Sequence, residues 1–228
     1  MSGLPRVAQY PLPTIEDLPA PRVPWRVDAE RAVLLVHDLQ EHFLRPFDRV
    51  GTPCAPMLRA VADLVAAARS REVPVVYSAQ PAVQSATDRA LLQDFWGPGL
   101  GAAPAAAARI VDEVAPAAGD VVLTKHRYSA LVRTELLDLV RAAGRDQLVV
   151  TGVYTSIGCW ATALHAFMED VQPFVVADAT ADFDAADHVA ALDHVARRCG
   201  RVVTAGDVLA AFAAGGRGRA ARAGGEER

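Results

Sequence analysis

The sequence has few cysteines, and they are not spaced as a metal site or a disulfide framework requires. Only 3 of the 228 residues are cysteine, at Cys54, Cys159 and Cys199, and no zinc-type motif is present. No uncharged apolar run of membrane-spanning length occurs, and no basic stretch leads into an apolar segment near the N-terminus. We therefore expect a cytoplasmic protein with reduced thiols, no cofactor, no metal and no membrane partner.

The sequence also lacks an excess of basic residues. Its 23 Lys and Arg residues stand against 27 Asp and Glu residues, which gives a formal net charge of -4 at pH 7. Non-specific nucleic-acid binding requires a strongly basic face, so we expect no nucleic-acid partner. Apolar residues make up 52% of the chain, which is enough to bury one core, and we expect one folded domain.

The two ends of the chain differ in composition from the middle. Residues 1–27 contain six of the fifteen prolines and little periodicity, which predicts an extended arm lying over the domain. Residues 214–228 are mainly Gly, Arg, Ala and Glu with no apolar face. Such a segment buries too little surface to offset the entropy of ordering, so we expect a mobile tail. The folded domain is therefore predicted over residues 28–213.

Within that domain, short β-branched runs alternate with longer segments rich in Ala and Leu. This alternation is typical of repeated βα units, which form a parallel sheet buried on both faces. We predict a Rossmann-like α/β fold with three layers, α/β/α, around a six-stranded parallel sheet. The predicted strands are 32–37, 73–79, 121–124, 147–153, 173–177 and 201–204. The predicted helices are 54–71, 104–115, 130–144, 158–170 and 186–199.

Four side chains that can take part in catalysis or in ligand binding follow the predicted strands, namely Asp38, Gln80, Lys125 and Tyr154. Ligands of open parallel sheets bind outside the carboxyl ends of the strands, so we expect these residues to meet at one edge. Taken singly, Asp38 is equally well explained as a structural carboxylate bonded to loop amides, and Lys125 as a solvated lysine. Together they favour an acid with an electrostatic partner.

Two further features have both a functional and an ordinary interpretation. Cys159 lies near a predicted helix N-terminus, where the helix dipole lowers a thiol pKa. A free cysteine is nevertheless among the most buried residue types, and no histidine base is assignable to this one by spacing. The segment 94–99, DFWGPG, is either part of a pocket or a tight turn with a packed aromatic.

The motifs around these residues carry a family resemblance. They are VHDLQEHF (36–43), YSAQP (77–81), DRALLQDFWGPGL (88–100), LTKHRYSAL (123–131) and the long block from 144 to 183. In these blocks the chain resembles the isochorismatases of siderophore pathways and the phenazine-pathway hydrolases that act on 2-amino-2-deoxyisochorismate. The resemblance implies an isochorismatase-like hydrolase fold, a homodimer, and cofactor-free cleavage of an enolpyruvyl ether to pyruvate and a ring alcohol.

The resemblance also implies roles for individual residues. Asp38 would protonate the methylene of the enolpyruvyl group, and Lys125 would position Asp38 and offset substrate charge. The implied substrate contacts are Gln80, Arg89, Trp96, Tyr128, Tyr154, Ser156 and the Gly158 amide. A cis peptide bond is expected between Val153 and Tyr154.

The chain departs from the family pattern at four positions near the site. His42 stands where Tyr is usual, His126 where Trp is usual, Leu131 where Phe is usual and Ser156 where His is usual. We expect isochorismate or its 2-amino analogue as substrate and rank isochorismate slightly ahead.

Two alternatives remain. One is a cysteine-dependent amidase of the same superfamily, whose nucleophile would fall at Gly158. Cys159 is one residue later, and a one-residue offset turns a helical side chain by about 100 degrees, so we expect its thiol to point away from the site. The other alternative is a non-catalytic docking protein of a biosynthetic assembly line.

Overall fold

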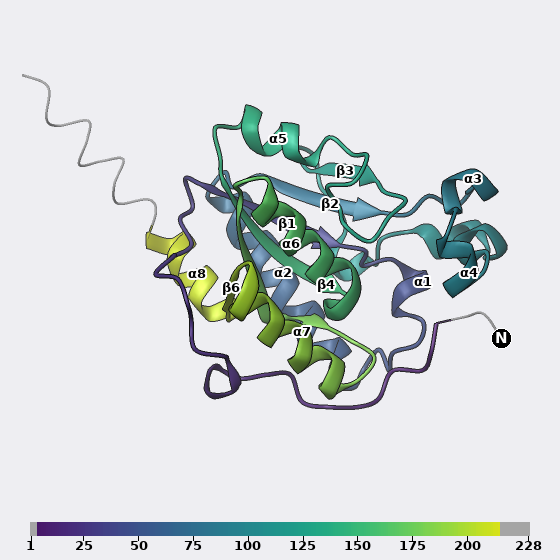
Figure 1. Cartoon of the computed structure of the whole chain (residues 1–228), viewed down its shortest axis with the longest axis horizontal. Coiled ribbons are helices and arrows are strands. Elements are labelled where there is room, and N and C mark those ends of the chain that lie inside the picture. The colour runs from purple at the N-terminus through teal and green to yellow at the C-terminus, as the bar shows by residue number, and fades with distance from the viewer. Residues whose placement is uncertain (1–3, 215–228) are drawn as a thin grey trace, which may run out of the picture.

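The computed structural model describes residues 4–214, and these form a six-stranded sheet in which all strands run parallel. The strand order is β3-β2-β1-β4-β5-β6, and the sheet crosses the middle of the molecule (Figure 1). The strands are β1 (Ala32–His37), β2 (Val75–Ala79), β3 (Val121–Thr124), β4 (Gln147–Val153), β5 (Gln172–Ala181) and β6 (Arg201–Val203). The prediction of a six-stranded parallel sheet is confirmed.

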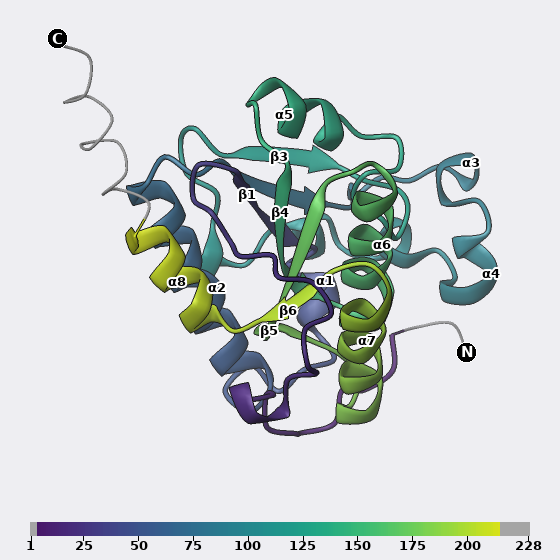
Figure 2. The ribbon, with the colours of Figure 1, turned by 60° about the vertical axis from the view of Figure 1, so that its left-hand side comes forward.

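Helices cover both faces of the sheet. On one face lie α2 (Cys54–Ser70) and α8 (Ala205–Ala214), and on the other lie α5 (Leu136–Ala142), α6 (Trp160–Met168) and α7 (Ala185–Arg198) (Figure 2). Successive residues of β1 point to opposite faces, so Leu34 belongs to the core under α2 and Leu35 to the core under α6. Every residue of β1 is buried because both faces are covered. The predicted three-layer fold is therefore confirmed.

Three short helices lie at the carboxyl edge of the sheet. Helix α1 (Glu41–Leu44) follows β1, while α3 (Ala86–Arg89) and α4 (Leu92–Trp96) lie in the connection from β2 to β3. Figure 1 shows α3 and α4 projecting beyond the sheet on the side where the strands end. None of the three was predicted, because helices of four or five residues are too short to show a periodic pattern.

The helix predicted over 104–115 is wrong. The chain forms only two 3-10 turns there, Ala105–Ala108 and Asp112–Val114. Between them Ile110 pairs with Gln40 in an antiparallel bridge, and the Val111 amide donates to the Leu39 carbonyl at 3.0 Å. Backbone groups bonded to the segment after β1 are not available for an α-helical ladder, so tertiary pairing overrides the high helix propensity of alanine.

One other predicted helix begins later than expected, and one helix was not predicted. The helix predicted over 130–144 begins only at Leu136, because the preceding residues form a loop in which Arg133 has a positive φ of 58°. Helix α8 was not predicted; its residues Val208 and Phe212, at helical spacing, pack into the core under α2. The folded region thus extends to Ala214, and the predicted mobile tail otherwise lies outside the described residues.

The N-terminal segment runs along the surface in a largely irregular path, with one 3-10 turn at Ile15–Asp17. In Figures 1 and 2 it passes beside α7 and β6 before it enters β1. Val7 and Tyr10 are buried, and the Ala8 amide donates to the Phe183 carbonyl at 2.8 Å. These contacts bring the start of the described chain, at Leu4, to the carboxyl edge of the sheet.

Candidate active site

The candidate site lies where the strand order reverses, between β1 and β4. These strands pair from Ala32 opposite Gln147 to His37 opposite Gly152, so the residues that follow them emerge side by side. Gly152 has a φ of 103°, and a Cβ there would lie 2.1 Å from the His37 carbonyl oxygen. Only glycine therefore allows β1 and β4 to approach this closely at their carboxyl ends. This crevice is the usual ligand site of an open α/β sheet.

Asp38 and Lys125, which the sequence brought together only as a hypothesis, form a buried ion pair. The Lys125 Nζ lies 2.8 Å from the Asp38 Oδ2, and the two residues are 2% and 4% exposed. Lys125 also donates to the Arg127 carbonyl at 2.8 Å. On the other carboxylate oxygen, the Ser78 hydroxyl donates to the Asp38 Oδ1 at 2.8 Å. Each oxygen of the carboxylate therefore has one fixed donor, which holds its orientation.

Sequence reasoning missed Ser78 and understated the signal for Lys125. Ser78 lies opposite His37 in the parallel register of β1 and β2. This pairing places Ser78 next to Asp38, the residue that follows His37. Lys125 is the only lysine among the 23 Lys and Arg residues. At this buried position beside Asp38, lysine provides a compact ammonium where arginine would provide a larger planar guanidinium.

His37 lies beside the ion pair and fixes the backbone around it. Its Nδ1 is 2.8 Å from the Val153 carbonyl oxygen and its Nε2 is 3.2 Å from the Tyr128 carbonyl oxygen. Burial is the main cause that lowers the pKa of His37; the charge of Asp38 opposes this effect, and the charge of Lys125 adds to it. A Cβ at Gly158 would lie 2.1 Å from the His37 Cε1, so the imidazole occupies the space that a side chain at 158 needs.

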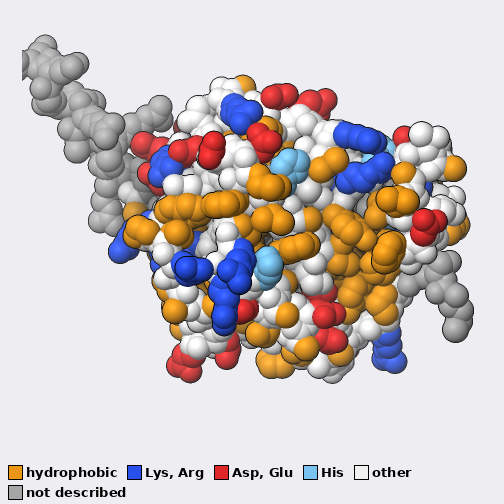
Figure 3. All heavy atoms as spheres, viewed as in Figure 1, with side chains coloured by type: hydrophobic (Ala, Val, Ile, Leu, Met, Phe, Trp, Pro, Cys, Tyr) orange, Lys and Arg blue, Asp and Glu red, His pale blue; other side chains and the backbone are white. Residues whose placement is uncertain are grey.

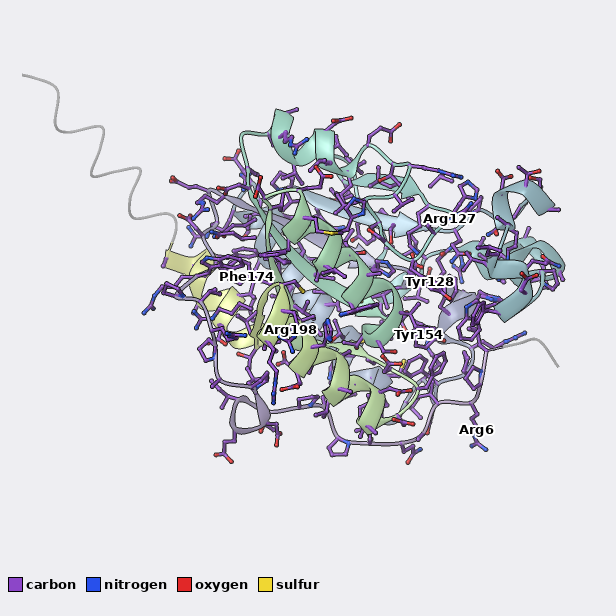
Figure 4. All side chains as sticks on the ribbon, viewed as in Figure 1. Arg6, Arg127, Tyr128, Tyr154, Phe174 and Arg198 are labelled. Carbon is purple, nitrogen blue, oxygen red and sulfur yellow. The ribbon has the colours of Figure 1, made fainter. Side chains whose placement is uncertain are left out.

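A cavity of about 260 Å³ opens above these residues. Eight of the predicted site residues line it, namely Asp38, Gln80, Arg89, Trp96, Lys125, Tyr128, Tyr154 and Gly158. The wall also includes His42, which the sequence placed near the site, and Gly99 of the segment 94–99, together with four residues that were not predicted, namely Leu4, His37, Arg45 and Ile157. In Figure 3 hydrophobic side chains gather on the surface between α6 and α4, and Figure 4 shows Tyr128 and Tyr154 at this end of the sheet.

Arg89 is a buried cation without an acidic partner among residues 4–214. Its Nε donates to the Gly97 carbonyl at 2.8 Å and its Nη1 to the Gln80 Oε1 at 3.3 Å. The guanidinium lies against Gly99, whose φ is 54° and where a Cβ would be 2.6 Å from the guanidinium carbon. Burial lowers the pKa of Arg89, although a guanidinium stays charged at neutral pH. A buried, unpaired guanidinium on a cavity wall is suited to a carboxylate ligand.

Aromatic rings form one wall of the cavity. Tyr154 stacks on Phe183 with ring centroids 4.1 Å apart, and Phe183 stacks on Trp96 at 6.3 Å. The Trp96 Nε1 donates to the Tyr128 hydroxyl at 2.8 Å, which ties α4 to the loop after β3. The Tyr154 hydroxyl donates to the Phe43 carbonyl at 2.6 Å. Tyr154 therefore presents its ring, rather than its hydroxyl proton, to a ligand.

Two predicted features of the turn after β4 are present. The Val153–Tyr154 peptide bond is cis, as predicted. Cys159 is fully buried and lies outside the cavity wall, with its Sγ 4.0 Å from the Thr151 carbonyl oxygen. Burial raises the pKa of the Cys159 thiol well above its usual value. The thiol thus points away from the site, as expected, and it is protonated.

Ser156 is not among the cavity-lining residues, although it was predicted as a substrate contact. Its amide donates to the Asp182 carboxylate, which lies after β5. His126 and Leu131 also lie outside the cavity wall, and Leu131 packs in the core under α5 and α6. Of the four departures from the family pattern, only His42 faces the cavity.

Comparison with known proteins identifies the family to which the chain belongs. Residues 32–207 match the family model described as the isochorismatase domain. The chain is 48% identical over 216 residues to phenazine biosynthesis protein PhzD1 of Pseudomonas aeruginosa, covering 92% of this chain and all of that one. The chain belongs to the isochorismatase family. It is a hydrolase of that family, which confirms the predicted enzyme class.

Two further relatives support this membership. An isochorismatase of Bacillus subtilis is 45% identical over 207 residues, which are 91% of this chain and 66% of that protein. The solved structure of an isochorismatase family protein from Burkholderia thailandensis is 26% identical, with a TM-score of 0.73 over 82% of this chain and 98% of that one. Within the described part of this isochorismatase-family chain, no helix is both long and apolar enough to span a bilayer.

Proposed function

We propose that this hydrolase cleaves the enolpyruvyl ether of isochorismate or of 2-amino-2-deoxyisochorismate, releasing pyruvate and a dihydro-hydroxybenzoate or its amino counterpart. The observation that carries the proposal is the Asp38 carboxyl group on the cavity wall, held at 2.8 Å by both Lys125 and Ser78. The names of two relatives, an isochorismatase and a phenazine biosynthesis protein, point to the same substrates.

Asp38 is ionised in its pair with Lys125, so it must first take up a proton from water when the anionic substrate binds. Asp38 then transfers this proton to the terminal methylene carbon of the enol ether. The electrons of the double bond form the new C–H bond and leave an oxocarbenium ion. Lys125 and Ser78 stabilise the carboxylate that proton donation creates, because both donors already point at its oxygens. Water adds to the cationic carbon and its proton returns to Asp38. The hemiketal then breaks its bond to the ring oxygen, the proton of its hydroxyl group moves to that oxygen, and pyruvate leaves with the new carbonyl group.

The other cavity residues bind and cover the substrate. Arg89 and Gln80 hold a substrate carboxylate, since the guanidinium has free donors and no acidic partner in the described chain. The rings of Trp96, Tyr128 and Tyr154 pack against the cyclohexadiene and keep bulk water from the oxocarbenium ion. The Gly158 amide completes the contacts on the side of β4.

The cysteine-dependent amidase is the weaker candidate. Gly158 has no side chain, and the Cys159 thiol is fully buried and protonated. Iodoacetamide treatment of the folded protein is expected to leave Cys159 unlabelled and the hydrolase activity unchanged. Labelling of Cys159 together with loss of activity would favour the amidase.

We propose further that the protein acts as a cytoplasmic homodimer in the biosynthesis of a siderophore or another secondary metabolite. Support comes from the resemblance of its motifs to the family and from its similarity to a phenazine biosynthesis protein. Light scattering on the purified chain should give twice the mass of one chain. A monomer mass at micromolar concentration contradicts the dimer.

Asp38→Asn tests the catalytic assignment. The amide keeps the shape of the side chain but has no acidic proton, so pyruvate release is expected to fall by about 10²–10⁴-fold. Asp63→Asn, an exposed change on α2, is the matched control and should keep full activity. Thermal unfolding of both variants separates loss of chemistry from loss of fold. More than a few per cent of wild-type activity in a folded Asp38→Asn protein rejects the assignment.

A further inference from the structure

His42 is a buried polar side chain on the cavity wall to which the mechanism gives no task. It lies on α1, is 8% exposed, and lines the same cavity as Asp38 and Arg89. Its ring meets the edge of Phe43 with centroids 5.0 Å apart. Within residues 4–214 its Nδ1 has no hydrogen-bond partner although it is shielded from solvent. An atom that solvent cannot reach is also closed to a ligand in the cavity, so such a ligand can meet the ring only through Nε2, which makes no hydrogen bond within those residues.

The charge around His42 is positive. Arg45 closes α1 three residues after His42, lines the cavity, and has no ion pair within the described residues. Arg89 lines the same cavity and also has no carboxylate partner in that part of the chain. Burial first, and then the charges of Arg45 and Arg89, lower the pKa of His42 to about 4. The imidazole is therefore neutral at pH 7, and its Nε2 presents either an N–H or a lone pair to the cavity, depending on the tautomer.

This corner of the cavity thus combines two unpaired guanidinium groups with one neutral hydrogen-bonding group. Its complement is a ligand with two carboxylates and one uncharged polar group. Isochorismate has that composition, because its ring carboxylate stands next to a carbon that bears a hydroxyl group. The amino analogue carries an ammonium at that carbon at neutral pH. This comparison rests on the proposed function.

We infer that His42 is the specificity-determining residue of this enzyme: it binds the ring substituent that distinguishes the two substrates and, beside Arg45 and Arg89, selects the hydroxyl over the ammonium. The hydroxyl donates to or accepts from the neutral imidazole without bringing charge into the site. An ammonium in the same place loses its hydration and is repelled by the two guanidinium groups. Those are the same two effects that keep His42 itself unprotonated.

The experiment compares kcat/KM for isochorismate and for 2-amino-2-deoxyisochorismate, with pyruvate as the readout. The wild-type protein is expected to prefer isochorismate by at least tenfold. His42→Phe keeps the ring and its edge contact with Phe43 but removes both nitrogens, and should lower kcat/KM for isochorismate by about 10–100-fold. For the amino compound the same variant should change kcat/KM by less than about threefold, because that substrate gains little from His42.

Two further variants test the direction of the effect. His42→Asn retains a donor and an acceptor and should recover part of the isochorismate activity lost in His42→Phe. His42→Asp adds a negative charge and should shift the preference toward the amino compound by at least tenfold. His194→Phe is the matched control, because His194 is an exposed residue of α7 whose ring also makes an edge contact, with Trp160 at 5.3 Å. It should leave both constants unchanged.

The outcomes separate this inference from the proposed function. A wild-type protein that releases pyruvate but prefers the amino compound overturns the inference and leaves the function standing. Equal losses for both substrates in His42→Phe also overturn it, since His42 then only shapes the cavity. A protein that hydrolyses neither compound contradicts the proposed function itself. If His42→Phe does not fold, the preference ratio of His42→Asp decides, and an unchanged ratio rejects the inference.

Discussion

Replacing Gly158 by alanine should damage both the fold and the activity, for a reason that lies in His37. A Cβ at position 158 would lie 2.1 Å from the His37 Cε1, 2.7 Å from Nε2 and 3.0 Å from Nδ1. The ring would have to move by about 1 Å to reach even a tight contact. It cannot do so freely, because its Nδ1 lies 2.8 Å from the Val153 carbonyl oxygen and its Nε2 lies 3.2 Å from the Tyr128 carbonyl oxygen, and the single N–H of the neutral ring donates to one of them.

The expected size of the effect follows from these contacts. Overpacking a fixed side chain costs about 1–3 kcal/mol, and each lost hydrogen bond adds about 1 kcal/mol. The neutral His37 ring can lose one such bond, so we expect Gly158→Ala to lower the free energy of unfolding by about 2–4 kcal/mol. Pyruvate release should fall as well, because displacement of His37 moves the loop that follows Lys125 and the turn after β4. Gly206→Ala, whose Cβ would have only a 3.6 Å contact with Thr204, is the control and should be neutral.

A double-mutant cycle with His37→Ala shows whether the imidazole is the cause. In the His37→Ala background the clash is absent, so adding Gly158→Ala should cost little. We expect a coupling free energy of about 2 kcal/mol from urea unfolding of the four proteins. Additive effects, or a Gly158→Ala protein as stable and active as the wild type, would refute the steric reasoning.

Two further predictions concern buried charge. Lys125→Met leaves the 4%-exposed Asp38 without its cation and should lower the free energy of unfolding by about 3–5 kcal/mol, measured by urea titration; a loss below 1 kcal/mol contradicts the buried pair. His188 is fully buried between the Tyr10 and Thr180 hydroxyls, and burial lowers its pKa to about 4. Because the unfolded chain binds a proton near pH 6.5 that folded His188 does not, stability is complete above that pH and is lost as pH falls toward 4. His188→Gln should reduce this slope by about 1.4 kcal/mol per pH unit between pH 6 and 4.5, and an unchanged slope excludes His188 as a cause.

The sheet was predictable because buried parallel strands leave a strong local pattern. The run at 32–37 is apolar except for His37, and the run at 147–153 contains the aliphatic residues Leu148, Val149, Val150 and Val153; both appear as strands with the predicted bounds. The length of β5 was not predictable. A register shift between Val150 and Gly152 lets pairing resume as far as Thr180 and Ala181, four residues beyond the predicted end. Such an irregularity depends on two strands at once and leaves no periodic signal in either.

The same distinction applies to the site. Asp38, Gln80, Lys125 and Tyr154 were found because each follows a strand, and strand ends meet at one edge. Arg45 and Leu4 were not predicted as cavity residues. They belong to the end of α1 and to the N-terminal segment, and the rule that strand ends meet at one edge does not give the position of either segment. Conversely, Ser156 lies in the turn after β4, yet the turn directs its amide to Asp182 and leaves it off the cavity wall. Chain position predicts nearness to the site better than it predicts side-chain direction.

The packing around Gly158 also bears on which chemistry this site can support. A nucleophile at position 158 would need the volume that the His37 ring occupies, and His37 is fixed by two backbone oxygens. Cys159 faces the core on the far side of the turn, so neither residue presents a thiol to the cavity. Among the residues of 4–214 that line the cavity, Asp38 alone carries a carboxyl side chain. In the proposed mechanism the acid is therefore Asp38, whereas covalent thiol catalysis would first require removal of the imidazole.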